Sequence, residues 1–127
     1  IGSPVYFADP AEEAVSFMDR LFFSTLNINK TMKVGAAVVS CRRGGNTATF
    51  DMLNKYFSMN GMPIATSQYW NMVHGSTPEE VLKDEEGMQT MRTLGRNMAF
   101  LMKSIQMGKE KLGLPEKEKT IFTSFHR

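Results

Sequence analysis

Cysteine is scarce in this sequence. The 127 residues include 1 cysteine, so the chain cannot form an internal disulfide bond. An iron–sulfur cluster held by cysteines needs four thiolates, and this chain alone does not supply them. So few cysteines suit a reducing compartment. We therefore expect a cytoplasmic protein whose residues in this chain bind no metal.

Long apolar runs and an excess of one charge are also absent. The 15 Lys and Arg residues nearly balance the 13 Asp and Glu residues, for a formal net charge of +2. No basic run is dense enough to predict a nucleic-acid partner, and no apolar stretch is long enough to cross a membrane. A hydrophobic content of 42% and a charged content of 22% are typical of a globular domain, and the length suits one domain.

The sequence also lacks an initiator methionine, and it begins in what reads as the end of a buried strand. We therefore expect residues 1–127 to be the C-terminal part of a single domain whose first strands lie outside this chain. On this view the chain holds about two strands of its own, which is too few for an independent sheet.

The opening stretch, Ile1 to Pro10, predicts a strand end, a tight turn and a helix start. Gly2 and Ser3 should end the strand, and Pro4 should hold Ser3 extended. Asp9 is a candidate helix N-cap with Pro10 in the first helical position. Ligands of open α/β sheets bind beyond the carboxyl ends of the strands. The pair Tyr6-Phe7 is therefore either an exposed contact for a flat aromatic ligand or part of an ordinary turn that packs down.

The remaining chain alternates between apolar runs and amphipathic stretches, which predicts an α/β fold with a doubly wound parallel sheet. Two strands are expected, one around the apolar run 34–39 and a short one at 62–65. Helices are expected over 11–26, from 46 or 47 to 59, and over 86–112. The connection 66–86 is long enough to predict a functional role, and it includes a capped helical turn at 76–80.

A glycine-containing loop, Cys41-Arg42-Arg43-Gly44-Gly45-Asn46, follows the first of these strands directly. Backbone N–H groups in such a loop, beside a helix N-terminus, form a small electropositive nest. The alternative is a solvated turn whose two arginines have no role. Cys41 itself reads as a small, half-buried residue at a strand end.

The segment Ser3-Pro4-Val5-Tyr6-Phe7 resembles the second flavin-contacting loop of the flavodoxin-like NADPH-dependent FMN reductases. This broad family includes quinone reductases and iron–sulfur flavoproteins. The similarity runs from Ile1 to near Leu112, and the order of its pieces carries it. It implies a flavodoxin-like fold whose missing first half holds three strands, two helices and the phosphate-binding loop. Any cysteine run for an iron–sulfur cluster would lie in that half.

The resemblance also implies a function and a set of binding residues. The expected function is an FMN-dependent oxidoreductase that takes hydride from NADPH or NADH and passes electrons to a quinone, a flavin or another acceptor. The alternatives are a non-enzymatic electron carrier of the flavodoxin type and a flavin-free α/β binding domain. No catalytic side chain is expected. The cofactor-binding residues implied are Ser3, Pro4, Val5, Tyr6, Phe7, Cys41, Arg42, Arg43, Gly44, Gly45 and Asn46.

Three further expectations concern the end of the chain and its assembly. Tyr69 and Trp70 either shape a substrate pocket after the last strand or simply cover the sheet, and His74 is expected to be a surface or hydrogen-bonded residue. The apolar tail 120–127 should dock on its own sheet or on a partner subunit. The family implies a dimer or tetramer.

Overall fold

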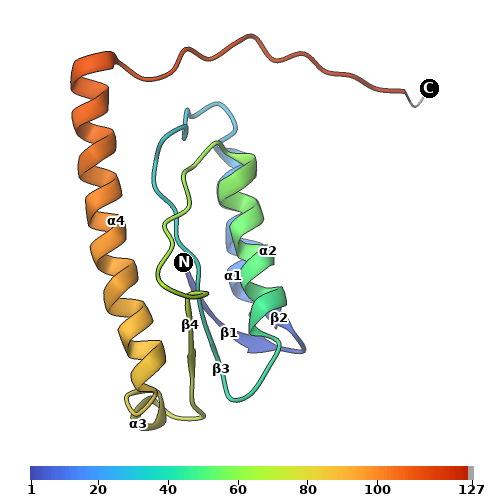
Figure 1. Ribbon diagram of the computed structural model, residues 1–127. Coiled ribbons are helices and arrows are strands. Elements are labelled where there is room, and N and C mark those ends of the chain that lie inside the picture. The colour runs from blue at the N-terminus through green and yellow to red at the C-terminus, as the bar shows by residue number, and fades with distance from the viewer. Residues whose placement is uncertain (126–127) are drawn as a thin grey trace.

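A computed structural model describes residues 1–125 of the chain, so His126 and Arg127 of the predicted docking tail lie outside the described residues. Strands β1 (Gly2–Tyr6), β3 (Val38–Cys41) and β4 (Met72–His74) are parallel, and β2 (Asp9–Pro10) pairs antiparallel with β1. The strand order is β2-β1-β3-β4. Helices lie on both sides of this sheet (Figure 1), which confirms the predicted doubly wound α/β architecture.

One face of the sheet is covered by α1 (Glu12–Ser24) and α2 (Asn46–Met59). Met18 of α1, Val39 of β3 and Leu53 of α2 are fully buried and form the centre of this core. These residues lie in the predicted helical stretches 11–26 and 46–59 and in the apolar run 34–39, so helical periodicity located this half of the core. Gly61 ends the α2 region in a left-handed conformation with φ of 65°.

The other face is covered by α4 (Glu85–Leu112), which lies along the sheet at the left of Figure 1. Leu94 is its most deeply buried large side chain and packs against Ala36 and Ala65. The short helix α3 (Pro78–Val81) precedes it, with the Thr77 hydroxyl accepting from the Glu80 N–H at 3.3 Å as predicted. The long helix and its capped predecessor were therefore both predictable from local signals.

The opening stretch differs from its prediction. β1 continues through Tyr6, and Phe7 and Ala8 then turn the chain with positive φ angles of 51° and 66°. Asp9 belongs to β2 and does not cap α1, whose N-cap is Ala11. The buried Ser3 hydroxyl instead accepts from the Ala11 N–H at 2.8 Å. Gly2 to Pro4 pair with β3, and Val5 and Tyr6 pair with β2. These pairings provide hydrogen bonds that the predicted early turn would have lost, so β1 runs longer.

The predicted strand at 62–65 was also misplaced. Ile64 makes an isolated parallel bridge to Gly35, and the third parallel strand is β4, inside the predicted connection. The buried amide of Asn71 holds the approach to β4, because it donates to the Ala65 carbonyl at 3.4 Å and accepts from the Ser67 hydroxyl at 2.8 Å. A strand of 3 residues gives too little periodic signal to be found from sequence.

Beyond α4 the described part of the tail runs away from the helices along the top of Figure 1. Ile121, Phe122 and Phe125 are each close to nine-tenths exposed. These residues do not dock on the sheet of this chain, and docking of the tail on a partner subunit stays a prediction.

Candidate functional site

The three parallel strands end at one edge of the sheet, and the loops that follow them lie together there. Pro4 pairs with Ser40, and Cys41 pairs with His74, so the registers place the ends of β1, β3 and β4 side by side. This is the edge at which open α/β sheets bind ligands. Each predicted cofactor-binding residue belongs to β1 or β3, to the loop that follows one of these strands, or to the start of α2.

The turn after β1 exposes both of its aromatic side chains. Tyr6 is 61% exposed, and Phe7 is fully exposed at the tip of the turn. Phe7 and Ala8 are left-handed without being glycine, a conformation that costs about 1 to 3 kcal/mol each. Neither side chain of the aromatic pair packs against the described residues of this chain. Of the other predicted residues here, Ser3 is buried, Val5 is half-buried and Pro4 is exposed.

The loop after β3 touches the loop after β1. Gly45 has a φ of 91°, and a Cβ atom there would lie 3.0 Å from the Ala8 Cα and 3.0 Å from a Val5 methyl group. Gly45 is also the N-cap of α2, and no side chain caps that helix. The first N–H groups of α2 therefore lack a side-chain acceptor, beside the exposed side chains of Arg42 and Arg43. This edge is suited to an electron-rich or anionic group.

Cys41 closes β3 with a buried, free thiol. Burial raises the pKa of this thiol, and a hydrogen bond from the Arg43 backbone opposes that shift only in part. A thiol held protonated is a poor nucleophile. Cys41 is therefore a packing residue of the loop, as its position predicted.

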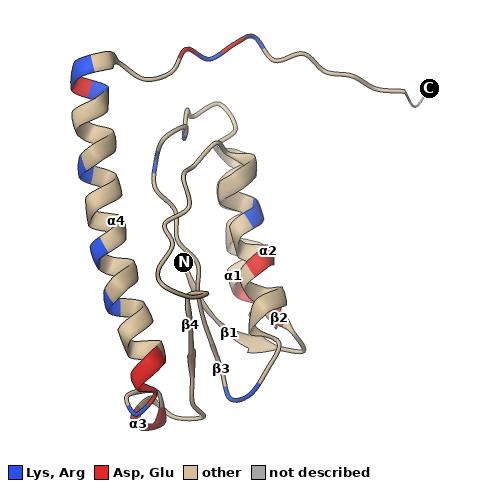
Figure 2. Ribbon diagram, viewed as in Figure 1, with Lys and Arg blue, Asp and Glu red and all other residues tan. Residues whose placement is uncertain are grey.

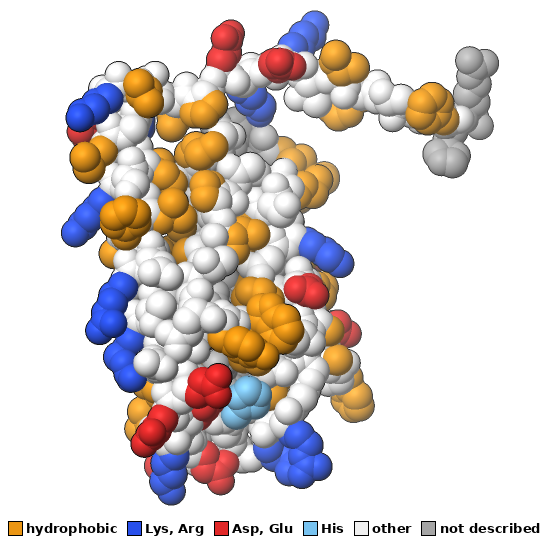
Figure 3. All heavy atoms as spheres, viewed as in Figure 1, with side chains coloured by type: hydrophobic (Ala, Val, Ile, Leu, Met, Phe, Trp, Pro, Cys, Tyr) orange, Lys and Arg blue, Asp and Glu red, His pale blue; other side chains and the backbone are white. Residues whose placement is uncertain are grey.

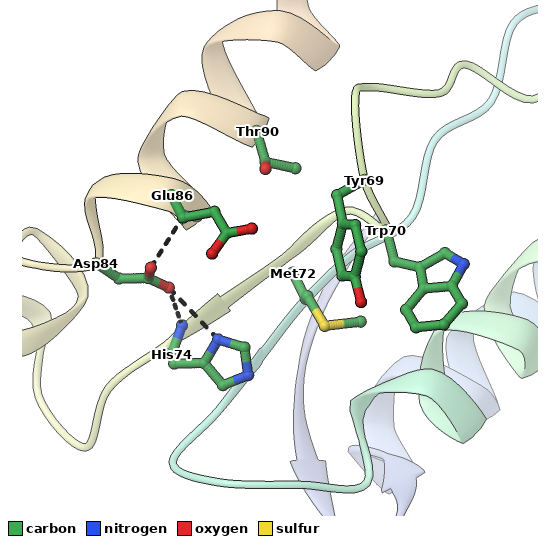
Figure 4. Close-up of a pocket in the computed structure, with 8 residues that line it drawn as sticks. Tyr69, Trp70, Met72, His74, Asp84, Glu86 and Thr90 are labelled. Atoms are coloured by element: carbon green, nitrogen blue, oxygen red, sulfur yellow. Dashed lines mark hydrogen bonds and ion pairs between the residues drawn. The ribbon is translucent and has the colours of Figure 1, made fainter.

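The end of β4 joins the start of α4 to the start of α2 through three polar side chains, His74, Asp84 and Asn46. The Asp84 carboxylate accepts from the His74 backbone N–H at 2.7 Å and from the Gly87 N–H at 2.9 Å. The same carboxylate lies 3.4 Å from the His74 Nδ1 atom (Figure 4). On the other side of the ring, His74 Nε2 lies 3.0 Å from the amide nitrogen of Asn46.

Asp84 carries a negative charge in this arrangement. Burial alone would raise the pKa of Asp84, but the hydrogen bonds from Gly87 and His74 outweigh it and hold the pKa below its usual value. The sequence did not single out Asp84, because its partners lie on other elements. Its one local signal was an acidic residue in front of a helix that begins with Glu85 and Glu86.

A cavity of about 150 Å³ lies beside this group. Tyr69 and Trp70 line it with their ring centroids 5.0 Å apart, although they precede β4 and do not follow it as predicted. The imidazole lies next to an apolar patch and an acidic side chain on the surface in Figure 3. The lining residues are Tyr69, Trp70, Met72, His74, Asp84, Glu86, Gly87 and Thr90.

Charge is divided along this edge of the sheet. Figure 2 shows basic residues on the loop after β3 and acidic residues at the start of α4.

Across residues 1–125, no helix is long and apolar enough to cross a membrane. In the same residues, no cluster of three or more His, Cys, Asp or Glu side chains is arranged to hold a metal ion.

An iron–sulfur flavoprotein of Methanocaldococcus jannaschii is 29% identical over 113 residues, which cover 84% of this chain and 58% of that protein. The crystal structure of a WrbA-like flavodoxin from Agrobacterium tumefaciens superposes with a TM-score of 0.53 and 16% identity, over 77% of this chain and 64% of that one. No family model matches the chain. The chain therefore has a flavodoxin-like fold, spans little more than half of its curated relative, and is similar in sequence to a flavoprotein.

Proposed function

We propose that this chain is the C-terminal part of an FMN-dependent oxidoreductase that uses NADPH or NADH. The observation that carries the proposal is the contact between the two loops at the carboxyl edge of the sheet. Gly45 approaches Ala8 so closely that a Cβ atom would crowd it, and the exposed Phe7 lies next to Ala8 in the same turn. Similarity to an iron–sulfur flavoprotein supports a flavin as the ligand of these loops.

The residues of this edge fit a flavin in chemistry. Exposed Tyr6 and Phe7 offer apolar faces for a flat ring system. The uncapped N–H groups of α2 suit the electron-rich pyrimidine side of a flavin, where negative charge develops on reduction. When bound, a flavin accepts hydride from a nicotinamide and passes electrons to an acceptor such as a quinone or a second flavin.

The chain's own residues would bind and orient both partners of this reaction. Arg42 and Arg43 are exposed beside the loop and would meet the phosphates of the nicotinamide cofactor or strengthen the positive field near the pyrimidine. Tyr69 and Trp70 would shape the pocket for the acceptor. The phosphate-binding loop would come from the remaining part of the protein, which we propose to be cytoplasmic and a dimer or tetramer.

An electron carrier of the flavodoxin type is the main competing function. Carriers of this kind are usually strongly acidic, because their partners dock electrostatically, whereas this chain has a net charge of +2. A flavin-free binding domain is the second competitor. Such a domain would keep the sheet, but it would not explain why an aromatic pair is exposed at a turn with left-handed backbone angles.

The test is the visible absorption spectrum of the purified full-length protein, before and after NADPH is added without oxygen. A flavin spectrum that bleaches supports the reductase. A flavin that stays oxidised with NADPH and with NADH indicates a carrier. No flavin, even after incubation with FMN, would leave the binding domain.

A variant pair tests the turn after β1. We expect Phe7→Ala to weaken FMN binding roughly 2- to 10-fold, which corresponds to an aromatic contact of about 0.5 to 1.5 kcal/mol. Phe100→Ala is the matched control, because Phe100 is a 75% exposed phenylalanine on α4. Equal FMN affinities in the two variants would contradict the stacking role of Phe7.

A further inference from the structure

The group formed by Asp84, His74 and Asn46 joins three elements, and neither Asp84 nor His74 has a role in the proposed function. Asp84 precedes α4, His74 ends β4 and Asn46 begins α2. Figure 4 shows the Asp84 carboxylate against the imidazole of His74 at the end of β4. The imidazole is 45% exposed, whereas the side chain of Asp84 is 17% exposed. Solvent therefore reaches the imidazole ring of His74, whereas its two partners, the Asp84 carboxylate and the Asn46 amide, are largely buried.

Asp84 is held in place by a close approach of α4 to β4. A Cβ atom on Gly87 would lie 2.3 Å from Asp84 Oδ2 and 3.1 Å from the Val73 Cα, so only glycine leaves room for the carboxylate. The ionised carboxylate lies 3.4 Å from His74 Nδ1 and favours a proton on that nitrogen. In the neutral ring Nε2 is then a hydrogen-bond acceptor.

Asn46 has its amide nitrogen on the acceptor side of the ring. This nitrogen lies 3.0 Å from His74 Nε2, and it donates to the Met72 sulfur at 3.0 Å. Asn46 is only 7% exposed, so its amide has few other partners. Neutral His74 thus fixes the amide with its nitrogen toward β4 and its oxygen away from the ring.

Protonation of His74 reverses this polarity. The imidazolium carries a proton on Nε2, so the 3.0 Å contact would bring two donors together. Rotation of the amide by half a turn removes the conflict, because its oxygen then accepts from Nε2. The rotation breaks the weak hydrogen bond from Asn46 to the Met72 sulfur and forms a charge-assisted hydrogen bond from His74 Nε2 to the amide oxygen.

We propose that His74, oriented by Asp84, is a positioning residue that sets which polar end of the Asn46 amide the loop 41–46 presents to its ligand. The amide oxygen points away from the ring when His74 is neutral, and the NH₂ group does so when His74 is protonated. Because the ligand is taken to be the flavin, this inference rests on the proposed function.

Other titratable groups surround His74, and Asp84 is the one in contact with its ring. Asp84 and Glu86 come from α4, Tyr69 from the segment before β4, and Cys41 from β3, where it pairs with His74. Glu80 of α3 accepts from the backbone N–H of Ser76. These groups act on the ring at longer range than the carboxylate of Asp84.

The experiment follows the side-chain NH₂ resonances of Asn46 and the ring nitrogens of His74 by NMR in the full-length protein, from about pH 5 to 9. We expect one shared transition, with the proton on Nδ1 at its alkaline end. Asp84→Asn keeps an oxygen for the helix cap but removes the charge that favours a proton on Nδ1, so the alkaline form should no longer hold its proton mainly on that nitrogen. His74→Gln should abolish the transition in the Asn46 resonances.

His126→Gln is the matched control, because His126 is the only other histidine in the sequence. It should leave the transition of Asn46 unchanged. Asn46 resonances that stay constant while His74 titrates would overturn the inference, as would a neutral ring with its proton on Nε2. Both of these readings use the unmodified protein, so they hold even where a variant does not fold.

FMN affinity measured over the same pH range separates this inference from the proposed function. Both the inference and the proposed function are supported if FMN affinity changes with pH at the midpoint of the Asn46 transition and does not vary with pH in His74→Gln. Tight FMN binding without a transition in Asn46 overturns the inference alone. A transition in Asn46 without FMN binding would contradict the proposed function and the identity of the ligand, and would leave the amide reversal itself supported.

Discussion

Gly45 is the residue on which the geometry of the candidate site depends most directly. It has a left-handed φ of 91°, it is the N-cap of α2 and provides no capping side chain, and its Cα faces the turn after β1. Gly44 precedes it in the same loop, and a Cβ atom there would meet nothing within 4 Å. The two neighbouring glycines therefore differ in their surroundings.

We predict that Gly45→Ala lowers the free energy of unfolding by about 2 to 4 kcal/mol. About 1 to 2 kcal/mol comes from the left-handed backbone, and the remainder comes from crowding against Ala8 and Val5. Gly44→Ala should change stability by less than about 0.5 kcal/mol. Denaturant unfolding of the two full-length variants measures the difference, and equal midpoints would contradict the loop contact.

The sequence predicted the residues of this contact better than those of the polar group beside it. Tyr6 ends β1, Phe7 follows it, and Gly45 lies in the short loop after β3, so local turn chemistry and strand order were enough to bring them together. Asp84 bonds the backbone of His74, 10 residues earlier in the chain, and Asn46 meets His74 across 28 residues. Contacts of this kind depend on the register of β4, which the sequence did not reveal.

At the scale of elements, α4 covers one face of the sheet through a narrow stripe. Leu94 is 6% exposed and packs on the segments that precede β3 and β4, whereas Leu112 at the end of the helix is 88% exposed. Within the predicted helix 86–112, Leu94 is buried and Met102 is exposed. Its half-buried apolar residues include Met91, Met98, Leu101 and Ile105. A period of 3.6 residues locates the buried face of a helix, and packing decides how far along the helix burial extends.

We predict that Leu94→Ala lowers the free energy of unfolding by about 2 to 5 kcal/mol, because it leaves a cavity between α4 and the sheet. Leu112→Ala makes the same chemical change at an exposed position and should cost less than about 0.5 kcal/mol. Thermal or denaturant unfolding gives both values. A large loss in Leu112→Ala, or none in Leu94→Ala, would mean that α4 does not dock as described.

At the scale of the whole molecule, the sheet is covered unevenly. The outer edge of β1 is paired with β2 through Val5 and Tyr6, and β2 is only 2 residues long. Apolar side chains are exposed on α1, where Phe17 is 56% and Phe23 is 78% exposed. Exposed strand edges and apolar patches of this kind mark contact surfaces or aggregation sites. The predicted count of about two strands was too low, since three parallel strands form, but the sheet remains small.

The last prediction concerns these uncovered surfaces. We expect residues 1–127 expressed alone to self-associate, because the outer edge of β1 before Val5 has no paired strand and the outer face of α1 has no cover within the described residues. The full-length protein should instead sediment as one defined species, since the proposed N-terminal part would pair with β1 and shield α1. Sedimentation velocity of both proteins over a range of concentrations makes the comparison. Monomeric behaviour of residues 1–127 at every concentration would show that these surfaces need no partner, and would count against the proposal that further strands of the same protein complete the sheet.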